Sequence, residues 1–263
     1  MNGEKKPDLR RYARQVSFPP LGPGGQRRLA AGRVLVVGAG GLGTHAAELL
    51  ARAGVGFLRL VDDDRVDLTN LHRQSLYDAD DAEEERPKVR AAAAHLRRIN
   101  AATAVEAIEA RLTGQNMAEL ADGVGLILDG TDNFAARFVI NDYAVKTATP
   151  WVFAGAVGAE GQVLAVVPPR TPCLRCLFDA PPPPCADPSC RAAGVLGPAV
   201  AAIAALQAAE AIKLLAGAAE AVSPYLLKLD LWANTVQRID AARAAADADC
   251  PCCKARRFDY LSA

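Results

Sequence analysis

The strongest constraint on the fold lies in residues 34–64, VLVVGAGGLGTHAAELLARAGVGFLRLVDDD. This stretch reads as an apolar strand, a glycine-rich turn, a helix and a second strand. Gly38, Gly40 and Gly43 fit the pattern G-x-G-x-x-G, and Asp62 follows at about the distance expected for a ribose-binding acid. Such glycines let a phosphate approach backbone N–H groups at a helix N-terminus. The segment predicts a nucleotide site, but NAD, FAD, SAM and ATP proteins all use this turn.

Strand and helix signals continue to alternate up to residue 167. Strands are expected over 34–40, 57–64, 105–112 and 125–133, and as two strands around Gly158 and Gly161; helices are expected over 44–54, 87–100 and 134–147. This alternation predicts an α/β fold: a Rossmann-like, doubly wound and mainly parallel sheet with helices on both faces.

The alternation of strand and helix signals ends after Pro168. Residues 171–190 are rich in Pro and Cys and lack periodicity, which predicts a long loop. Residues 193–217 are apolar but interrupted by polar side chains, so we expect a buried or subunit-contacting helix rather than a membrane span. Residues 225–240 alternate like an antiparallel pair of strands. We expect one domain, with an N-terminal helical arm (1–32), a nucleotide-binding core (33–167) and a C-terminal part (168–263).

Composition indicates which partners and which cellular compartment to expect. Thirty basic and thirty acidic residues give a formal charge of zero, so we expect neither a nucleic-acid nor a membrane partner. The polar N-terminus has no apolar core typical of a signal peptide. Seven cysteines in such a chain favour a reducing cytoplasm, with thiols used for metal binding or chemistry rather than for disulfides.

Further polar residues follow the strand ends and do not suit a plain dehydrogenase. Asn70, Arg73 and Gln74 lie beyond one strand, Lys88 opens a helix, and Asp132 ends another strand. In a doubly wound sheet these strand ends meet at one crevice. Fixed cations there favour a polyphosphate, and an acid beside phosphates is a natural Mg²⁺ ligand. Each residue taken alone could be a solvated charge or a helix cap; the combination predicts an ATP site.

In combination, five motifs resemble the ThiF/MoeB/HesA family, bacterial relatives of ubiquitin-activating enzymes. They are RYARQ at 11–15, GAGGLG at 38–43, D-x-D-x-V-x-x-x-N-L-x-R-Q at 62–74, P-K-V at 87–89 and D-G-T-D-N at 129–133. The resemblance covers nearly the whole chain. It implies ATP-dependent adenylation of the C-terminal glycine of a small ubiquitin-like sulfur carrier, ending in Gly-Gly, with release of pyrophosphate.

The resemblance also implies roles for single residues. Asp62 would hold the ribose hydroxyls, Asp132 would bind Mg²⁺, and Arg14 would reach the phosphates of the other subunit of a homodimer. The remaining residues implied to contact ATP are Gly38, Gly40, Gly41, Gly43, Asp64, Asn70, Arg73, Gln74 and Lys88. One departure concerns the loop before Pro87: many family members have a glycine there, whereas this chain has DAEEERPK.

Two C-x-x-C pairs predict a structural zinc site. Cys173 with Cys176, and Cys250 with Cys253, would form a tetrahedral site of four thiolates with no open position. Many members of the family carry such a zinc. The alternative is that one pair is redox-active or merely buried. Cys252 is a spare thiol that could compete as a ligand.

Cys190 lies apart, in DPSCRAAGVLGP. A neighbouring arginine and a following helix N-terminus would favour its thiolate. In ThiF-like members a cysteine in this context is linked to covalent sulfur handling, so Cys190 is a candidate catalytic thiol. The alternative is an incidental loop thiol, and Cys185 nearby shows that thiols occur here without a motif.

Several functions remain open from the sequence. The carrier could be ThiS-like, for thiazole and thiamine synthesis, or MoaD-like, for molybdopterin; C-R-A-A-G-V-L-G-P favours ThiF. Since no rhodanese domain is present, a separate donor, a cysteine desulfurase or a rhodanese, is expected to supply sulfur. The alternatives are an NAD-dependent oxidoreductase, an enzyme adenylating a tRNA-linked small carboxylate, and a non-catalytic carrier-binding partner.

Overall fold

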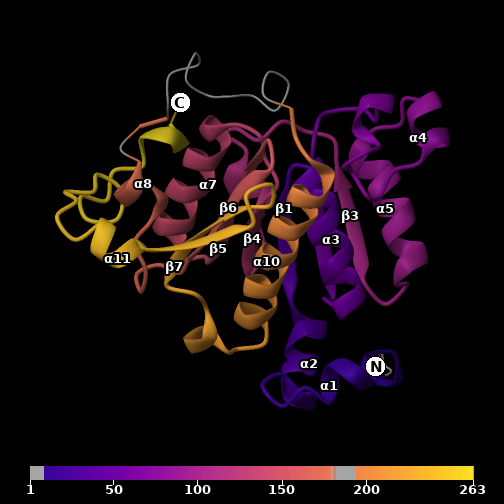
Figure 1. The fold of residues 1–263 in the computed structure, drawn as a ribbon, viewed down its shortest axis with the longest axis horizontal. Coiled ribbons are helices and arrows are strands. Elements are labelled where there is room, and N and C mark those ends of the chain that lie inside the picture. Colours follow the sequence, from indigo (N-terminus) through magenta and orange to yellow (C-terminus); the bar gives the residue numbers. More distant parts are fainter. Residues whose placement is uncertain (1–8, 179, 182–193, 263) are drawn as a thin grey trace.

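An eight-stranded sheet forms the centre of the computed structural model, which describes residues 9–178, 180–181 and 194–262 (Figure 1). The strand order is β3-β2-β1-β4-β5-β6-β7-β8. The first five strands pair in parallel and the last three extend the sheet antiparallel. The strands are β1 (Arg33–Val37), β2 (Phe57–Val61), β3 (Ala104–Ile108), β4 (Leu126–Asp129), β5 (Trp151–Val157), β6 (Glu160–Val166), β7 (Tyr225–Asp230) and β8 (Thr235–Asp240).

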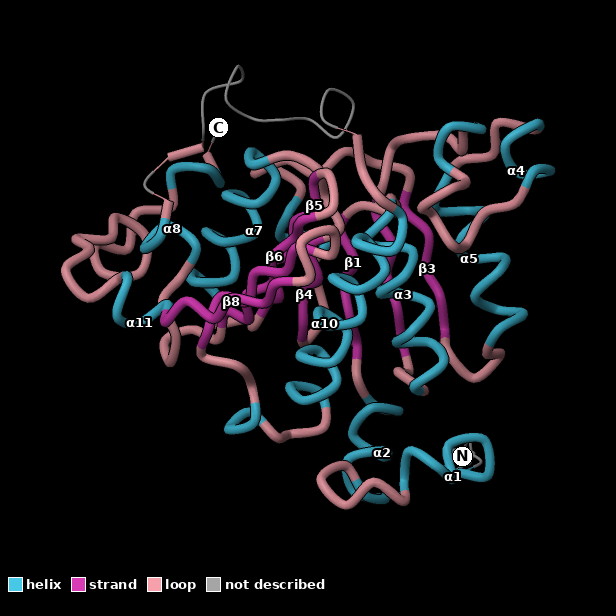
Figure 2. Tube along the Cα trace, viewed as in Figure 1, coloured by secondary structure: helices cyan, strands magenta, loops and turns pink. Residues whose placement is uncertain are grey.

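Helices cover both faces of the sheet (Figures 1 and 2). One face carries α3, α5 and α10, and the other carries α7 with the C-terminal segment. The helices are α1 (Ala13–Val16), α2 (Gly22–Ala31), α3 (Gly41–Ala53), α4 (Ala79–Glu83), α5 (Lys88–Ile99), α6 (Met117–Leu120), α7 (Phe134–Thr147), α8 (Leu174–Leu177), α10 (Gly197–Leu215) and α11 (Ala241–Ala244), with the 3-10 turns η1 (Leu9–Tyr12), η2 (Leu68–Asn70), η3 (Ala219–Ala221) and η4 (Asp259–Leu261). The predicted Rossmann-like fold with an antiparallel extension is confirmed.

The glycine turn follows from the burial of β1. Four of the five residues of β1 are buried, and the strand pairs with β2 on one side and β4 on the other. Directly after β1 the chain reverses into α3, whose inner face is alanine- and leucine-rich and packs on the sheet and on α10. The carboxyl ends of β1, β2 and β4 therefore meet at one edge, where the crevice of a doubly wound sheet lies.

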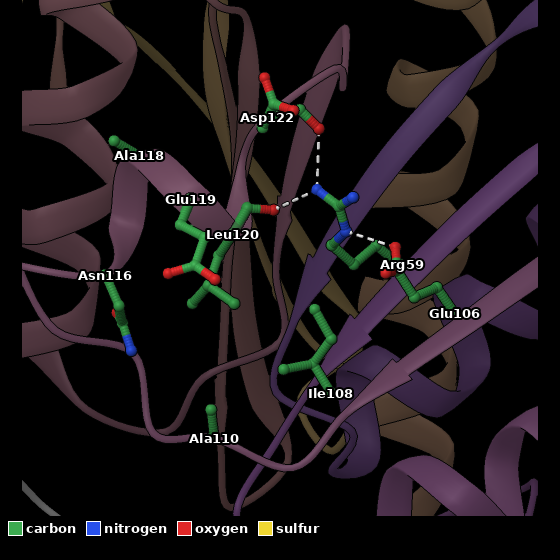
Figure 3. Close-up of a pocket in the computed structure, with 9 residues that line it drawn as sticks. All are labelled: Arg59, Glu106, Ile108, Ala110, Asn116, Ala118, Glu119, Leu120 and Asp122. Atoms are coloured by element: carbon green, nitrogen blue, oxygen red, sulfur yellow. Dashed lines mark hydrogen bonds and ion pairs between the residues drawn. The ribbon is translucent and has the colours of Figure 1, made fainter.

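One detail differs from the sequence expectations. The predicted loop over 171–190 contains the short helix α8, which presents Cys173 as its N-cap residue. The connection from β3 to β4, for which no element is predicted from the sequence, has only the four-residue α6, because its sequence around Gly114 is polar and cannot cover a sheet face. A hollow of about 610 Å³ is left over β2 and β3, lined by Arg59 and Glu106 among others (Figure 3).

The apolar helix α10 is long and apolar enough to be considered a membrane span, but its contacts are those of a core helix. It packs against β4, β5, β6 and α3. Its buried Gln207 donates through Nε2 to the carbonyls of Asp129 and Val152, both at 2.8 Å. Buried Glu210 pairs with Lys213 at 2.6 Å. The Gln207 bonds tie the helix to the sheet, as predicted for a buried helix, whereas the Glu210–Lys213 pair lies within the helix itself.

Candidate active site

The glycine turn is closed by backbone packing that no side chain would permit. Gly38 has φ +89°, and a Cβ there would lie 2.6 Å from the carbonyl oxygen of Gly130. A Cβ on Gly43 would overlap the carbonyl oxygen of Gly38. The Gly130 N–H donates to Val37 at 2.7 Å, which joins the turn to the loop after β4. The turn therefore leaves its backbone and the first turn of α3 open to a phosphate.

Asp62 lies at the end of β2 and holds the tip of this turn. Its Oδ2 accepts from the backbone N–H of Ala39 at 2.6 Å, and its Oδ1 accepts from the N–H of Asp64 at 2.8 Å. Burial raises the pKa of Asp62, and the nearby positive charge of Lys88 opposes that rise. The structure thus places this carboxylate at the glycine turn, and its ribose-binding role stays a prediction of the motif.

Lys88 opens α5 and points back to the same edge. Its side chain is buried, and Nζ pairs with Asp64 Oδ2 at 2.7 Å. Tyr77 links the glycine turn to the start of α5, since its hydroxyl lies 2.7 Å from the carbonyl oxygen of Ala39 and 3.2 Å from that of Lys88. Burial raises the pKa of Tyr77 well above its usual value, so the phenol remains a donor at neutral pH. Two residues separate this tyrosine from the R-Q pair of the long motif, but no sequence pattern marked it as part of the site.

Gln74 provides a polar atom that still needs a partner. The side chain is buried, its Oε1 has no hydrogen-bond partner among the described residues, and Nε2 lies 3.9 Å from where a Gly40 Cβ would be. Buried polar groups are normally bonded, so an orphan beside the glycine turn fits a polar ligand there. The neighbouring Arg73 is half-buried; its Nη1 donates to Thr69 at 2.8 Å and its backbone lies against Gly41.

Asn70 serves the loop between β2 and α5. Its Oδ1 accepts from the N–H of Asp67 at 3.3 Å, which completes a capping box for η2. The carbonyl of Asn70 accepts from the backbone N–H groups of Arg73 and Gln74, both at 3.1 Å. In this structure Asn70 therefore holds the loop that presents the two following side chains.

Asp132 is exposed in the loop between β4 and α7. Its carboxylate has one long contact, 3.5 Å from Asn133 Nδ2, and Asn133 rather than Asp132 is the N-cap of α7. The loop begins at Gly130, which packs on Gly38. An exposed carboxylate on a loop fixed to the glycine turn is free to ligate a cation bound to a nucleotide.

Arg14 lies far from this edge of its own chain. The arm is pinned to the other end of α3: Gln15 Nε2 donates to Ala53 O at 2.9 Å, and the Tyr12 ring packs against Gly54. The thirteen residues of α3 put roughly 20 Å between that end and the glycine turn. Arg14 itself is exposed on α1, which lies at the bottom of Figure 1. It cannot serve the nucleotide site of the same subunit.

Four cysteines form a cluster where α8 meets the C-terminal segment. The sulfurs of Cys173, Cys176, Cys250 and Cys253 all lie within 4.8 Å of one another. The Sγ–Sγ distances of 3.8 Å within the first pair, and of 3.6 and 3.3 Å between pairs, approach the separation of about 3.8 Å in a tetrahedral Zn–S site. The donor set fits zinc, as the C-x-x-C pairs predicted.

The fifth described thiol, Cys252, lies beside the cluster and is hydrogen-bonded to Cys173, one of its four members. It is fully buried, and its Sγ accepts from Asn141 Nδ2 at 3.4 Å. A hydrogen bond from Cys252 also helps to hold the carboxylate of Asp142 on α7. Cys252 therefore packs the C-terminal segment onto α7. The candidate thiol Cys190 lies outside the described residues.

In the loop before Pro87, a residue other than glycine adopts the left-handed backbone conformation. Glu85 has φ +46° and is exposed. We expect Glu85→Gly to raise the free energy of unfolding by about 1 kcal/mol, since the αL conformation is strained for residues with a Cβ. Urea denaturation of the variant and the wild type measures this change in the free energy of unfolding. As a control, Glu83→Gly within α4 should lower stability; equal effects of the two substitutions would contradict the strain.

Comparisons with known proteins agree with this geometry. The model of the ThiF family matches residues 12–252. The chain is 43% identical to the sulfur carrier protein ThiS adenylyltransferase of Bacillus subtilis, over 96% of this chain and 74% of that protein. It is 41% identical to the sulfur carrier protein adenylyltransferase of Thermus thermophilus, over 94% and 92%.

The fold also matches a solved structure at lower identity. The structure of Escherichia coli MccB with ATP superposes with a TM-score of 0.77 at 22% identity, over 96% of this chain and 76% of that one. This likeness concerns the fold alone. The family match and the two close relatives, together with the glycine turn and its surrounding side chains, show that the chain belongs to the ThiF family.

Proposed function

We propose that this protein adenylates the C-terminal glycine of a ubiquitin-like sulfur carrier protein, using ATP and releasing pyrophosphate. The observation that carries the proposal is that Asp62, Gln74, Lys88 and the loop of Asp132 all lie around the glycine turn. Relatives named for ThiS favour a ThiS-like carrier, and hence the thiazole of thiamine, over a MoaD-like one. The expected setting is the cytoplasm.

The residues divide the chemistry between them. Attack of a weakly nucleophilic carboxylate on the α-phosphate needs alignment and charge neutralisation more than a base. Lys88 and Arg73 would bind the phosphates, Asn70 and Gln74 would orient them, and Asp62 would hold the ribose. Mg²⁺ held by Asp132 would neutralise phosphate charge. Zinc on the four cysteines would be structural, because four thiolates leave no open position.

The direct test is formation of the acyl adenylate. The protein is incubated with ATP and a carrier ending in Gly-Gly, and intact-mass spectrometry looks for the carrier–AMP adduct. The adduct should appear with ATP and vanish when the terminal glycine is deleted. ATP binding without an adduct on any carrier would favour a non-catalytic partner, and adenylation of a small carboxylate instead would favour the tRNA-linked alternative.

Arg14 is proposed to act on the other subunit of a homodimer. Co-expression of Arg14→Ala and Asp132→Ala chains with different tags should then restore activity. Random pairing makes half of the dimers mixed, each with one intact site, so roughly a quarter of the wild-type rate should return. Each variant alone should be nearly inactive, and no recovery in the purified mixed dimer would show that Arg14 does not act in trans.

A further inference from the structure

A buried ion pair underlies the loop that carries Asp132. Arg137 on α7 is 7% exposed, Asp129 at the end of β4 is fully buried, and Arg137 Nε lies 3.0 Å from Asp129 Oδ2. The guanidinium is enclosed by two aromatic rings, 5.0 Å from that of Phe134 and 5.2 Å from that of Phe153. Neither charge reaches the crevice, so neither can touch a nucleotide.

Both members of the pair also hold the residue before Asp132. Asp129 Oδ1 accepts from the backbone N–H of Thr131 at 2.9 Å and from its hydroxyl at 2.6 Å. Arg137 Nη2 donates to the carbonyl of Thr131 at 2.9 Å and to that of Ala154 on β5 at 3.2 Å. Every backbone polar group of Thr131 is thereby bonded to the pair, which fixes where the chain enters Asp132.

The same loop supports the glycine turn. The Gly130 N–H donates to Val37, and the Gly130 carbonyl fills the space that a Cβ on Gly38 would need. From α10, Gln207 donates to the carbonyl of Asp129. A shift of this loop would therefore move the glycine turn and the Asp132 carboxylate relative to each other.

We propose that Arg137 is a positioning residue: with Asp129 it sets the geometry of the Asp132 carboxylate relative to the glycine turn, and so the binding of the metal–nucleotide complex. A buried ion pair often adds little net stability, so its use here is geometric. The planar fork of arginine bonds a carboxylate and two carbonyls at once, which a lysine ammonium cannot reproduce. This inference rests on the proposed function of Asp132.

The test uses Arg137→Lys, with Thr131→Val as a milder second variant that removes only the hydroxyl bond. Affinity for ATP is measured with Mn²⁺ and with EDTA, and Mn²⁺ in the complex is followed by electron paramagnetic resonance. Arg137→Lys should lose the metal-dependent gain in ATP affinity and about 100-fold in kcat/KM, as expected for a small misplacement. Thr131→Val should show the same change in smaller measure, and Arg137→Lys should add nothing to Asp132→Ala.

The matched control is a second buried arginine–aspartate ion pair that also involves α7. Arg175 is 4% exposed and pairs with Asp142 on α7 at 3.3 Å. Arg175→Lys should lower Tm without changing the metal-dependent ATP affinity. The inference is overturned if Arg137→Lys lowers Tm but keeps that affinity and kcat/KM, or if its effect adds to that of Asp132→Ala.

The experiment distinguishes failure of the proposed carrier adenylation from failure of the inference about Arg137. If the wild type adenylates no carrier but binds Mn²⁺–ATP more tightly than ATP, the metal-dependent affinity of the Arg137 variants still decides the inference. If Arg137→Lys does not fold, the Thr131→Val result decides it. A wild type with no metal-dependent ATP affinity would overturn the inference about positioning itself.

Discussion

Replacing Asp132 with alanine is expected to lower the adenylation rate by about 100- to 1,000-fold, the range seen when one group that stabilises transition-state charge is removed. The carboxylate is exposed on a loop fixed to the glycine turn and, among the described residues, makes one long contact. Its loss should therefore leave the fold intact and remove the anchor of the proposed Mg²⁺. Steady-state kinetics with saturating carrier measure the change.

The control for this variant is Asp122→Ala. Asp122 is equally exposed but lies before β4, whereas Asp132 lies after it, so the two residues mark opposite ends of one strand. Asp122→Ala should retain the wild-type rate, and both variants should keep the wild-type Tm. An Asp132→Ala enzyme with near wild-type turnover at saturating Mg²⁺ would remove Asp132 from the metal site.

Replacing Cys250 with serine is expected to abolish zinc binding and to lower the free energy of unfolding by more than about 3 kcal/mol, because metal binding energy is folding energy in such sites. The cluster joins α8 to the C-terminal segment, which also contacts α7 through the Phe138–Tyr260 ring pair at 4.9 Å and through hydrogen bonds such as that from the Tyr260 N–H to Asp142 Oδ2 at 3.1 Å. Without the metal, the segment after Cys250 should become accessible to protease.

Cys252→Ser is the matched substitution. The side chain is buried beside the cluster, where it is hydrogen-bonded to Cys173, and it also bonds to Asn141 and Asp142 on α7, which hold it outside the group of four mutually close sulfurs. It should therefore keep one zinc per chain by elemental analysis, with a smaller loss of stability. If Cys252→Ser loses the metal and Cys250→Ser keeps it, the ligand set is the alternative one that includes Cys252.

Hydrophobic periodicity was sufficient to predict much of the fold. The helix expected over 134–147 is α7 with the same bounds, and the antiparallel pair over 225–240 is β7 and β8. The strand pair has a strong local signal, alternation around a turn, whereas α7 is apolar and buried over most of its length rather than along one face. The expectation of a continuous loop over 171–190 was wrong for α8, because four residues are too few to show a period.

Tertiary packing decided what the sequence could not. The motifs predicted which residues lie near the glycine turn, and the resemblance assigned Arg14 to the site of the other subunit; the attachment of the arm to the far end of α3 appears only in the structure. The motifs did not reveal Asp129 and Arg137, whose importance lies in being buried together below Asp132. The sequence also did not reveal that Glu85, in the loop before Pro87 where many family members have a glycine, adopts a left-handed backbone conformation. Burial, pairing and backbone strain depend on the whole fold, so they appear only in the structure.

The central claim is tested most directly by carrier-dependent ATP–pyrophosphate exchange. The purified protein is assayed with labelled pyrophosphate against each small ubiquitin-like protein of the same organism that ends in Gly-Gly. We predict exchange with a ThiS-like carrier, lost when its terminal glycine is removed and lost in Asp132→Ala. Absence of exchange with every such carrier, in a protein that still binds ATP, would contradict the proposal that this chain activates a sulfur carrier.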